Sequence, residues 1–438
     1  MNRGFYTIMA AQFFSSLADN ALLIAAIALL TEISAPDWMT PLLRLCFTIS
    51  YIVFAAYVGI FADSMPKGRV MFLTNNVKML GCLLMLFGGH PLLAYAIVGL
   101  GAAAYSPAKY GILTEMLPPS KLVVANGWIE GLTVIAIILG VVLGGALILP
   151  SVTGPLSALP ALRAIGIDTT ARAAIFIIFF IFGLSALINL FIPDTGARYP
   201  KSSFEPVKTF CGFMRSCLVL WKDKLGQTSL CVTSMFWGAG AVLQFLVLAW
   251  ADTNFGLSLS QATVLQATVS IGIAIGAMSA ARFIPIKKSL SVLPMGVVMG
   301  VIVILAAFFK RSMLPYDISL PGGITIGASI IAAGLIMIAV GALAGFFVVP
   351  MNALLQNRGY VLMSAGRSIA VQNFNENSSM LIMLGVYSLM IKGGLSTSSI
   401  MAIFGAFVAL GMVLVIRTHR QNALMHDLSG QIGEEKKF

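Results

Sequence analysis

A few ionisable and amide side chains interrupt the long apolar stretches of this sequence. Lys109 lies within GAAAYSPAKYGILTEM, Asp19 and Asn20 lie within the first apolar stretch, and Glu130 ends the segment NGWIE. A charged side chain inside a membrane is costly unless it faces a polar cavity or a partner. We therefore treat these four residues as candidates for binding or gating.

A second polar group lies in the segment QNFNEN, residues 372–377. On a helix, Asn373 lies within about 60° of both Glu376 and Asn377, so we expect these three side chains to share a face. Glu130 and Glu376 each lie about eight to nine residues from the end of an apolar stretch, or about 12 to 14 Å deep at 1.5 Å per residue. The two carboxylates thus occupy similar depths in the two halves of the chain.

The two signs of charge suggest a ligand that carries both. An ammonium on a flexible stem suits a phosphate, and a carboxylate suits a cationic amine, so the mixed set matches a zwitterionic head group in one central cavity. A plainer interpretation is an ion pair between Lys109 and Glu130 that only joins two helices. A sugar, a peptide or a drug is also compatible with these groups.

The elements that position these residues are membrane spans. Hydrophobic residues make up 59% of the 438 and charged residues only 10%, a composition typical of a polytopic membrane protein. About 20 apolar residues cross the hydrocarbon. Twelve stretches of the sequence qualify, namely residues 6–31, 41–62, 70–89, 91–116, 122–149, 173–193, 228–251, 260–283, 289–309, 323–350, 367–391 and 395–416.

The distribution of Lys and Arg predicts the orientation of the chain. With the N-terminus inside, 19 of the 27 basic residues fall on the cytoplasmic side and five on the opposite side. The remaining three, Arg44, Lys78 and Lys109, lie within spans. Because basic loops are retained inside, we expect a multi-pass membrane protein with both termini in the cytoplasm. The formal charge of +11 then reflects topology and anionic lipid, and we expect no nucleic-acid partner.

The longest polar interval divides the spans into six and six. We expect an all-α membrane protein with an N-terminal six-helix bundle (1–193), a linker (194–227), a C-terminal bundle (228–416) and a short charged tail (417–438) that is disordered. This plan is typical of secondary transporters. In the linker, apolar residues recur at helical spacing opposite Lys208, Arg215 and Lys222, which indicates a short interfacial helix. A solvated linker with chance periodicity is the alternative.

The turn after the second span carries a recognisable motif. In GIFADSMPKGR, residues 59–69, Gly59 and Asp63 are followed by Gly68 between Lys67 and Arg69. This turn resembles the loop signature of the major facilitator superfamily, in which such residues lock two helices together, although the spacer here is about two residues longer. We assign a structural role to Gly59, Asp63, Gly68 and Arg69.

Several longer segments resemble a narrower family. They are AQFFSSLADNALL (11–23), AAAYSPAKYGIL (102–113), FWGAG (236–240), GFFVVPMNALLQNRG (345–359) and AVQNFNENSSMLIMLG (370–385). These segments closely resemble the bacterial lysophospholipid transporters of the major facilitator superfamily, and the similarity extends from about residue 5 to residue 416.

The resemblance implies a flippase. Its members move lysophosphatidylethanolamine and related lysolipids, such as lysophosphatidylglycerol, from the outer to the inner leaflet of the inner membrane, where an acyltransferase/acyl carrier protein synthetase partner re-acylates them. Asp19 and Lys109 carry over as head-group or gating residues. The chain departs from the family at Gln244, where relatives have an Arg. If that Arg pairs with the Asp of the first span in relatives, Asp19 must find another partner here.

No catalytic motif is present in the sequence. None of the three His residues is followed by Asp five positions later, and there is no HExxH, P-loop or Ser-centred nucleophile motif. We expect a monomeric carrier that is not an enzyme and needs no cofactor or metal. The alternative function is a proton-coupled exporter of drugs or small metabolites, in which transport would follow the protonation of Asp19, Glu130 or Glu376.

Overall fold

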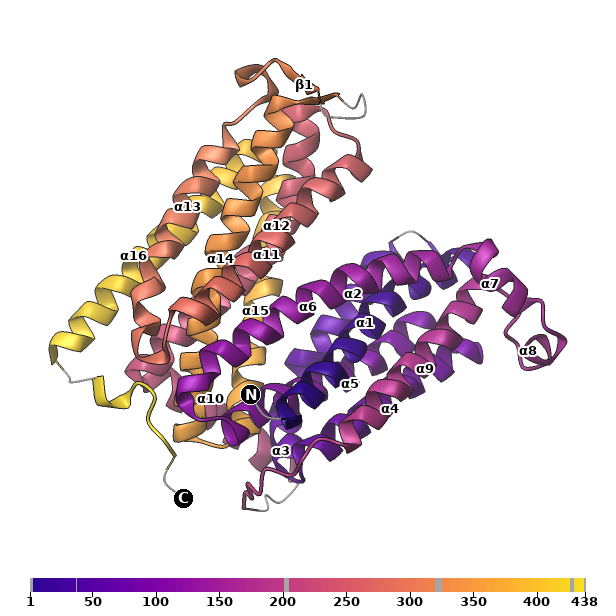
Figure 1. Ribbon diagram of the computed structural model, residues 1–438, viewed down its shortest axis with the longest axis horizontal. Coiled ribbons are helices and arrows are strands. Elements are labelled where there is room, and N and C mark those ends of the chain that lie inside the picture. The colour runs from indigo at the N-terminus through magenta and orange to yellow at the C-terminus, as the bar shows by residue number, and fades with distance from the viewer. Residues whose placement is uncertain (1–2, 37, 201–204, 320–324, 426–428, 437–438) are drawn as a thin grey trace. The chain divides into compact units, whose positions relative to one another are not determined.

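The computed structural model describes residues 3–36, 38–200, 205–319, 325–425 and 429–436. These ranges are almost entirely helical (Figure 1). The α-helices are α1 (Arg3–Glu32), α2 (Met39–Val53), α3 (Ala55–Asp63), α4 (Lys67–Leu86), α5 (Pro91–Met116), α6 (Pro119–Leu147), α7 (Pro150–Ser157), α8 (Pro160–Ala164), α9 (Thr170–Leu190), α10 (Pro206–Lys222), α11 (Lys224–Phe255), α12 (Leu259–Phe283), α13 (Leu293–Ala307), α14 (Ala328–Leu362), α15 (Ala365–Lys392) and α16 (Thr397–Met425). Three short 3₁₀ helices, η1 (Ile286–Val292), η2 (Arg311–Met313) and η3 (Ser429–Gln431), and an antiparallel hairpin of β1 (Asp317–Ser319) and β2 (Thr325–Gly327) complete the described part.

The twelve predicted spans each coincide with a helix or with two consecutive helices in the described ranges. Ten of these segments are long and apolar enough to cross a membrane, and the bent pair α2–α3 makes an eleventh. The twelfth is α15, whose segment QNFNEN lowers its hydropathy although its 28 residues are long enough. Residues 323 and 324 of the tenth predicted span lie outside the described ranges.

The second predicted span is not one straight helix. Its two parts, α2 and α3, meet at an angle of 65°. No Pro or Gly occurs between residues 49 and 58. Ser50, in the last turn of α2, donates its hydroxyl to the carbonyl of Cys46 four residues earlier and to that of Ala96 in α5. Such back-bonding bends helices, so Ser50 accounts for the bend better than the usual helix breakers do.

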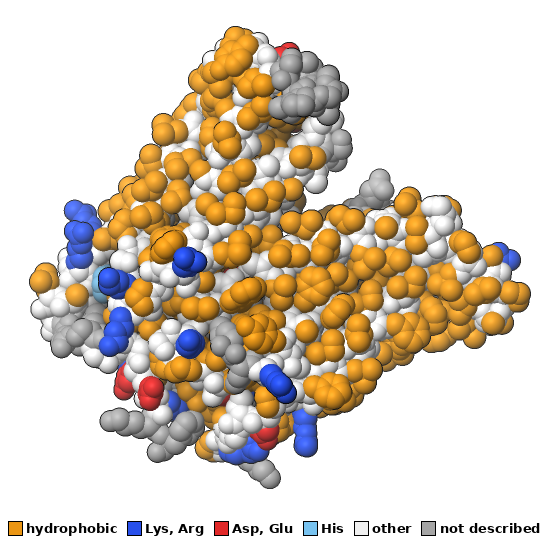
Figure 2. Space-filling model, in the orientation of Figure 1, with side chains coloured by type: hydrophobic (Ala, Val, Ile, Leu, Met, Phe, Trp, Pro, Cys, Tyr) orange, Lys and Arg blue, Asp and Glu red, His pale blue; other side chains and the backbone are white. Residues whose placement is uncertain are grey.

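The outer surfaces of the long helices are apolar. Figure 2 shows hydrophobic side chains along the flanks of the helices, with most basic groups near helix ends. Large side chains such as Phe180, Leu187, Val142 and Leu335 are more than half exposed. Exposing so much contiguous apolar surface to water is unfavourable, whereas its contact with lipid tails is not.

The chain folds into two compact units, and two helices belong to both. The first unit comprises Met1–Leu117, Leu132–Val219 and Leu362–Phe374, and the second comprises Pro118–Gly131, Leu220–Val361 and Asn375–Phe438. Helix α6 therefore begins in the second unit and continues in the first. Helix α15 begins in the first unit and continues in the second. Each helix passes between units near its carboxylate, Glu130 or Glu376.

The first unit is held together by close packing of α1, α4, α5 and α9 (Figure 1). Its core consists of Ala and Leu residues of α1 with Phe182, Ile178 and neighbouring side chains of α9. Gly140 and Gly144 of α6 contribute close contacts, because a Cβ on Gly140 would lie 2.6 Å from the carbonyl oxygen of Leu17. Small residues at a spacing of four thus allow α1 and the second part of α6 to approach closely.

The second unit contains its own core around α11, α13, α14 and α16. Trp250 is fully buried there and packs edge-on against Phe255. Asp223 caps the N-terminus of α11 by accepting from the backbone N–H of Gly226, and Gly256 ends that helix with a φ of 67°. Most of the packing in this unit is between apolar side chains, as expected for helices in lipid.

The C-terminal tail is more ordered than the sequence predicts. The side chain of Glu434 lies 2.9 Å from the guanidinium of Arg358 in α14, which also binds Asp223 at 2.7 Å. Lys436 donates to the carbonyl of Tyr360. The expectation of a disordered tail is therefore wrong for residues 417–425, which continue α16, and for residues 429–436. The mostly buried Arg358 requires anionic partners, and the tail provides one of them.

Candidate functional site

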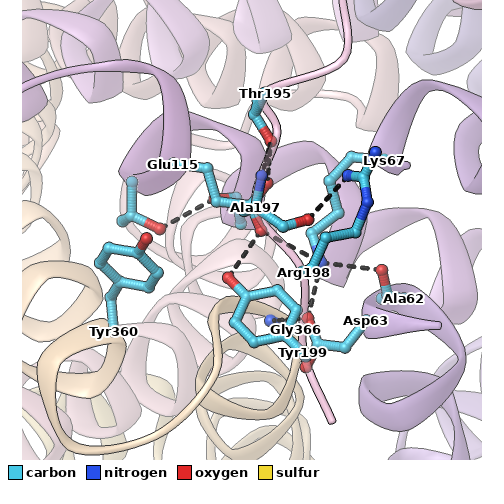
Figure 3. A network of polar contacts seen from close by, with 12 residues as sticks. Ala62, Asp63, Lys67, Glu115, Thr195, Ala197, Arg198, Tyr199, Tyr360 and Gly366 are labelled. Carbon is cyan, nitrogen blue, oxygen red and sulfur yellow. Dashed lines mark hydrogen bonds and ion pairs between the residues drawn. The ribbon is translucent and has the colours of Figure 1, made fainter. Parts of the chain in front are cut away.

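The loop motif forms a buried network in the first unit (Figure 3). Asp63, at the end of α3, accepts from the backbone N–H groups of Gly366 at 2.9 Å and Arg367 at 3.2 Å, in the first turn of α15. The ammonium of Lys67 lies 2.6 Å from the same carboxylate. A carboxylate at a helix N-terminus satisfies free N–H groups and the helix dipole together. The motif thus joins α3, α4 and the beginning of α15.

Glu115 of α5 is the second carboxylate in this network. Its two oxygens accept hydrogen bonds of 2.8 Å from the hydroxyls of Tyr199 and Thr195, and one oxygen lies 3.3 Å from the ammonium of Lys67. The side chains of Lys67 and Glu115 are both 2% exposed. Each carboxylate oxygen of Asp63 and Glu115 has a partner, so the network is saturated. This is the geometry of a structural joint.

Two glycines permit this joint. A Cβ on Gly59 would lie 2.9 Å from the Cβ of Ala370, and a Cβ on Gly68 would lie 2.9 Å from the carbonyl oxygen of Asn189. Gly366, which the sequence analysis does not select, is equally crowded, because its Cβ would lie 2.6 Å from the carbonyl oxygen of Gly59. Arg69, by contrast, is exposed.

A second buried ion pair lies deeper in the first unit. The ammonium of Lys78 in α4 donates to Asp19 of α1 at 2.7 Å and to the hydroxyl of Ser15 at 3.0 Å. The rings of Tyr105 and Phe182 lie 5.0 and 5.4 Å from this ammonium. Lys78 is 1% exposed at its side chain, whereas Asp19 is 19% exposed. Because this chain has Gln244 where relatives have an Arg, Asp19 needs another partner. That partner is Lys78, a residue of the same unit.

The ion pair continues into a chain of hydrogen bonds. Ser15 donates to Asn75 of α4, Asn75 donates to Ser185 of α9, and Ser185 donates to the carbonyl of Ala11. This chain fixes α1 against α4 and α9, and it orients Ser15 so that its oxygen accepts from Lys78.

The polar capacity of this cluster is not fully used. Within the described part of the chain, Asp19 Oδ1 is buried and has no hydrogen-bond partner. Unsatisfied buried polar groups are rare in folded proteins and indicate a functional or water-filled site. The ammonium of Lys109 also acts electrostatically on the Asp19 carboxylate.

Sequence analysis identifies Asp19 but misses Lys78 as a site residue. Lys78 is one of three basic residues within predicted spans. The same cost of burial that selects Lys109 selects Lys78, so the signal is present in the sequence. Its pairing with Asp19, 59 positions away, requires the fold.

The other predicted site residues have different surroundings. In the first unit, Asn20 donates to the carbonyl of Ser16 in its own helix, Lys109 lies 4.1 Å from the ring centre of Tyr110, and Asn373 donates to the hydroxyl of Ser106 at 2.9 Å. Asn20 therefore serves its own helix, whereas Asn373 joins α15 to α5.

Glu130, Glu376 and Asn377 belong to the second unit. Both carboxylate residues are buried, at 7% and 6% exposure. Four of the seven predicted binding or gating residues, Asp19, Asn20, Lys109 and Asn373, lie in the first unit, so the two units divide the predicted set. The proposed sharing of one cavity stays a prediction.

The beginning of α6 is attached in the second unit much as the beginning of α15 is attached in the first. Asn126 and Gln356 exchange two hydrogen bonds of 2.9 Å between α6 and α14. A Cβ on Gly127 would lie 2.5 Å from the Cβ of Ala281 in α12. The first part of α6 thus has a close contact at Gly127 and side-chain hydrogen bonds from Asn126. The first turn of α15 has a close contact at Gly366 and backbone N–H groups that donate to Asp63.

Comparisons with known proteins agree with this architecture. The profile of the Major Facilitator Superfamily matches residues 8–383. The chain is 42% identical over 395 residues to "Lysophospholipid transporter LplT" of Yersinia enterocolitica, which covers 90% of this chain and 89% of that protein. It is 41% identical to the protein of the same name from Yersinia pestis, over 90% of this chain and 88% of that protein. The chain is a member of the lysophospholipid transporter family of the major facilitator superfamily.

Solved structures of the superfamily share the fold. The transporter FucP, in the outward conformation, superimposes with a TM-score of 0.68 at 17% identity and covers 95% of this chain and 98% of that chain. A bacterial homologue of the iron transporter ferroportin gives a TM-score of 0.67 at 15% identity and covers 97% and 100%. Membership in this superfamily makes the chain a multi-pass membrane protein, which explains the apolar flanks in Figure 2.

Proposed function

We propose that this protein is a flippase for lysophosphatidylethanolamine and related lysolipids. The supporting observation is the identity of 42% over nine tenths of the chain with a protein named lysophospholipid transporter. In this proposal, alternating access moves the lysolipid from the outer to the inner leaflet of a bacterial inner membrane, where the missing acyl chain is restored.

The Asp19–Lys78 cluster is suited to a zwitterionic head group. Asp19 retains one oxygen without a hydrogen bond among the described residues, and a primary ammonium of the substrate fits this acceptor. Lys109 would supply an ammonium for the phosphate. Lys78 donates to the other oxygen of Asp19 and holds this carboxylate in one orientation, so it is a positioning residue.

The packing of α6 and α15 fits a gating role. Alternating access requires that some helix contacts break and form again in each cycle. The bonds from Asp63 to the beginning of α15 and from Asn126 to Gln356 are candidates, since both hold the first part of a helix that passes from one unit to the other. We propose that these contacts close the pathway on the side of the predicted cytoplasmic loops.

We propose that the protein lies in the inner membrane with both termini in the cytoplasm, and the distribution of basic residues supports this orientation of the termini. We also propose that the protein is a carrier without catalytic activity, and that a cytoplasmic acyltransferase/acyl carrier protein synthetase receives its product. The relatives are named as transporters, which supports the first of these two points.

A flux assay in proteoliposomes tests this proposal. Labelled lysophosphatidylethanolamine is placed in the outer leaflet, and its arrival in the inner leaflet is followed for the intact protein and for Asp19→Ala and Lys109→Ala. Lys392→Ala serves as a matched control, because Lys392 is an exposed cation at the end of α15. We expect movement by the intact protein and the control, and a loss of at least tenfold in the two variants.

Two outcomes would contradict the proposal in different ways. If no lysolipid moves, the substrate is wrong. If lysolipid moves equally in all variants, the site is wrong. Repeating the assay with and without a pH gradient tests the alternative of a proton-coupled exporter, for which flux would depend on the gradient.

A further inference from the structure

A small cavity lies in the first unit where α3, α10 and α15 meet. Its volume is about 240 Å³. Its walls include Gly59 of α3, Lys208, Thr209 and Gly212 of α10, and Arg367 of α15. At about 30 Å³ per water molecule, this space holds about eight waters, which is enough for a polar head group but not for a whole phospholipid.

The cavity combines positive charge with an unused hydroxyl. Among the described residues that line it, Lys208 and Arg367 are the ionic groups and none is a carboxylate. Lys208 pairs with Glu205 at 2.7 Å, but both side chains are more than half exposed, so this pair contributes little and exchanges readily. Thr209 is only 4% exposed, and within the described ranges its Oγ1 has no hydrogen-bond partner. A buried hydroxyl without a partner next to two cations is suited to an anionic oxygen.

The surroundings of the cavity indicate that its ligand comes from the membrane. Helix α10 directs Thr209 and Phe213 towards the first unit, and both side chains are buried. Val207 and Phe210, elsewhere on the surface of this helix, are 75% and 52% exposed. In a multi-pass membrane protein, an amphipathic helix of this kind lies at the level of the lipid head groups.

We propose that this cavity binds the phosphate head group of an anionic membrane phospholipid. The phosphate contacts Lys208, Arg367 and the hydroxyl of Thr209, while the acyl chains remain in the bilayer beside the apolar face of α10. The bound lipid links α10 to α3 and to the first turns of α15. This site is separate from the Asp19–Lys78 cluster, and the proposal does not depend on which substrate the protein transports.

Native mass spectrometry of the full-length protein in detergent measures the binding. Short-chain phosphatidylglycerol, phosphatidylcholine and inorganic phosphate are titrated in separate arms. We expect one saturable phosphatidylglycerol per chain, and about tenfold weaker binding for Arg367→Gln, because a charge-assisted contact to phosphate is lost. The matched control is Arg215→Gln, an exposed cation of α10 that does not line the cavity.

Two further variants separate binding from folding. Thr209→Val removes a hydroxyl that has no partner among the described residues, so it should weaken binding about threefold and leave the melting temperature in phosphatidylcholine unchanged or raised. Gly212→Leu fills the cavity, because a Cβ at Gly212 meets no atom within 4 Å. It should abolish the saturable binding without lowering the melting temperature, since Leu favours the helix more than Gly does.

Several results would overturn the proposal. Equal binding of phosphatidylcholine would show that the anionic charge is irrelevant. Equal weakening by Arg215→Gln and Arg367→Gln would show diffuse attraction to a basic helix. Full competition by inorganic phosphate at the concentration of the lipid would show an anion site rather than a lipid site. Full retention of binding in Gly212→Leu would place the lipid elsewhere.

Discussion

The first unit contains two buried Lys–Asp ion pairs. Their N–O distances are nearly equal, but the two carboxylates differ in how many other hydrogen bonds they accept. Lys67 lies 2.6 Å from Asp63, and Lys78 lies 2.7 Å from Asp19. Both ammonium groups are almost inaccessible. The Asp63 carboxylate is also shielded, at 6% exposure, whereas that of Asp19 is 19% exposed.

The partners of the two carboxylates differ more than the distances do. Asp63 binds two backbone N–H groups of α15 as well as Lys67, and Glu115 shares the charge of the same ammonium. Asp19 has Lys78 on one oxygen and no hydrogen-bond partner among the described residues on the other. A saturated network resists change, whereas an unsaturated one has capacity for a ligand. The same pair of residue types thus forms a joint in one place and a candidate binding group in the other.

The largest effect is expected from Lys78→Met. This substitution leaves Asp19 in the interior without its ion-pair partner, so we expect a loss of about 3 to 5 kcal/mol in the free energy of unfolding. Lysolipid flux should also be lost. Thermal unfolding in detergent and the proteoliposome assay measure these two effects.

The double variant Lys78→Met with Asp19→Asn is the control for this prediction. It removes both charges, so stability should return to near that of the intact protein while flux stays low. Recovery of flux together with stability would show that the pair is only structural, and the contrast with the Lys67–Asp63 pair would disappear.

A smaller effect is expected from Asp63→Ala. The two N–H groups at the beginning of α15 lose their acceptor, which costs about 2 kcal/mol as the loss of a helix cap. Lys67 keeps Glu115 as a counterion, so the cost stays below that of Lys78→Met. Asp63→Asn retains one acceptor oxygen, so its melting temperature should lie between those of the intact protein and Asp63→Ala. A loss as large as that of Lys78→Met would mean that Glu115 does not share the charge.

The sequence predicts the joint around Asp63 and Lys67 better than the candidate binding group of Asp19 and Lys78, because the joint depends on a local sequence pattern. The turn from Gly59 to Arg69 has its signature within eleven residues, and the spans follow from length and apolar composition. Even α15, whose polar segment lowers its hydropathy, is among the twelve apolar stretches that the sequence shows. The bend at Phe54 is not predicted, because Ser50 is an ordinary residue until the carbonyl of Ala96 lies beside it.

The ion pair of Asp19 could not be predicted because its parts are far apart in the sequence. Lys78, Asn75 and Ser185 come from α4 and α9 and meet Asp19 and Ser15 of α1 only in the folded unit. A burial argument selects charged residues one at a time, and it gives no distances between them. The sequence therefore supplies Asp19 as a candidate, and the structure supplies its partner.

Single hydroxyl groups sharpen the contrast between the two pairs. Ser15→Ala removes an acceptor of Lys78 and a donor to Asn75, so it should cost about 1 to 2 kcal/mol. Tyr199→Phe removes one of several contacts to Glu115, and its cost should be about 1 kcal/mol or less. Denaturant or thermal unfolding of both variants in one detergent gives the difference. Equal losses in the free energy of unfolding would show that the additional contacts of Glu115 do not compensate for the missing Tyr199 hydroxyl.

The smallest effect is expected from the exposed pair of Asp194 and Arg198. The guanidinium of Arg198 donates to both oxygens of Asp194, and these hydrogen bonds lower the pKa of Asp194 to about 2 from 3.8. Because the folded pKa is the lower one, the contribution of the pair is fully present above pH 3.8 and is lost as the pH falls through about 2. Exposed ion pairs contribute little to stability, so Asp194→Asn should leave thermal unfolding at pH 7 unchanged. A shift as large as that of Tyr199→Phe would show that burial does not decide which of these ion pairs contribute to stability.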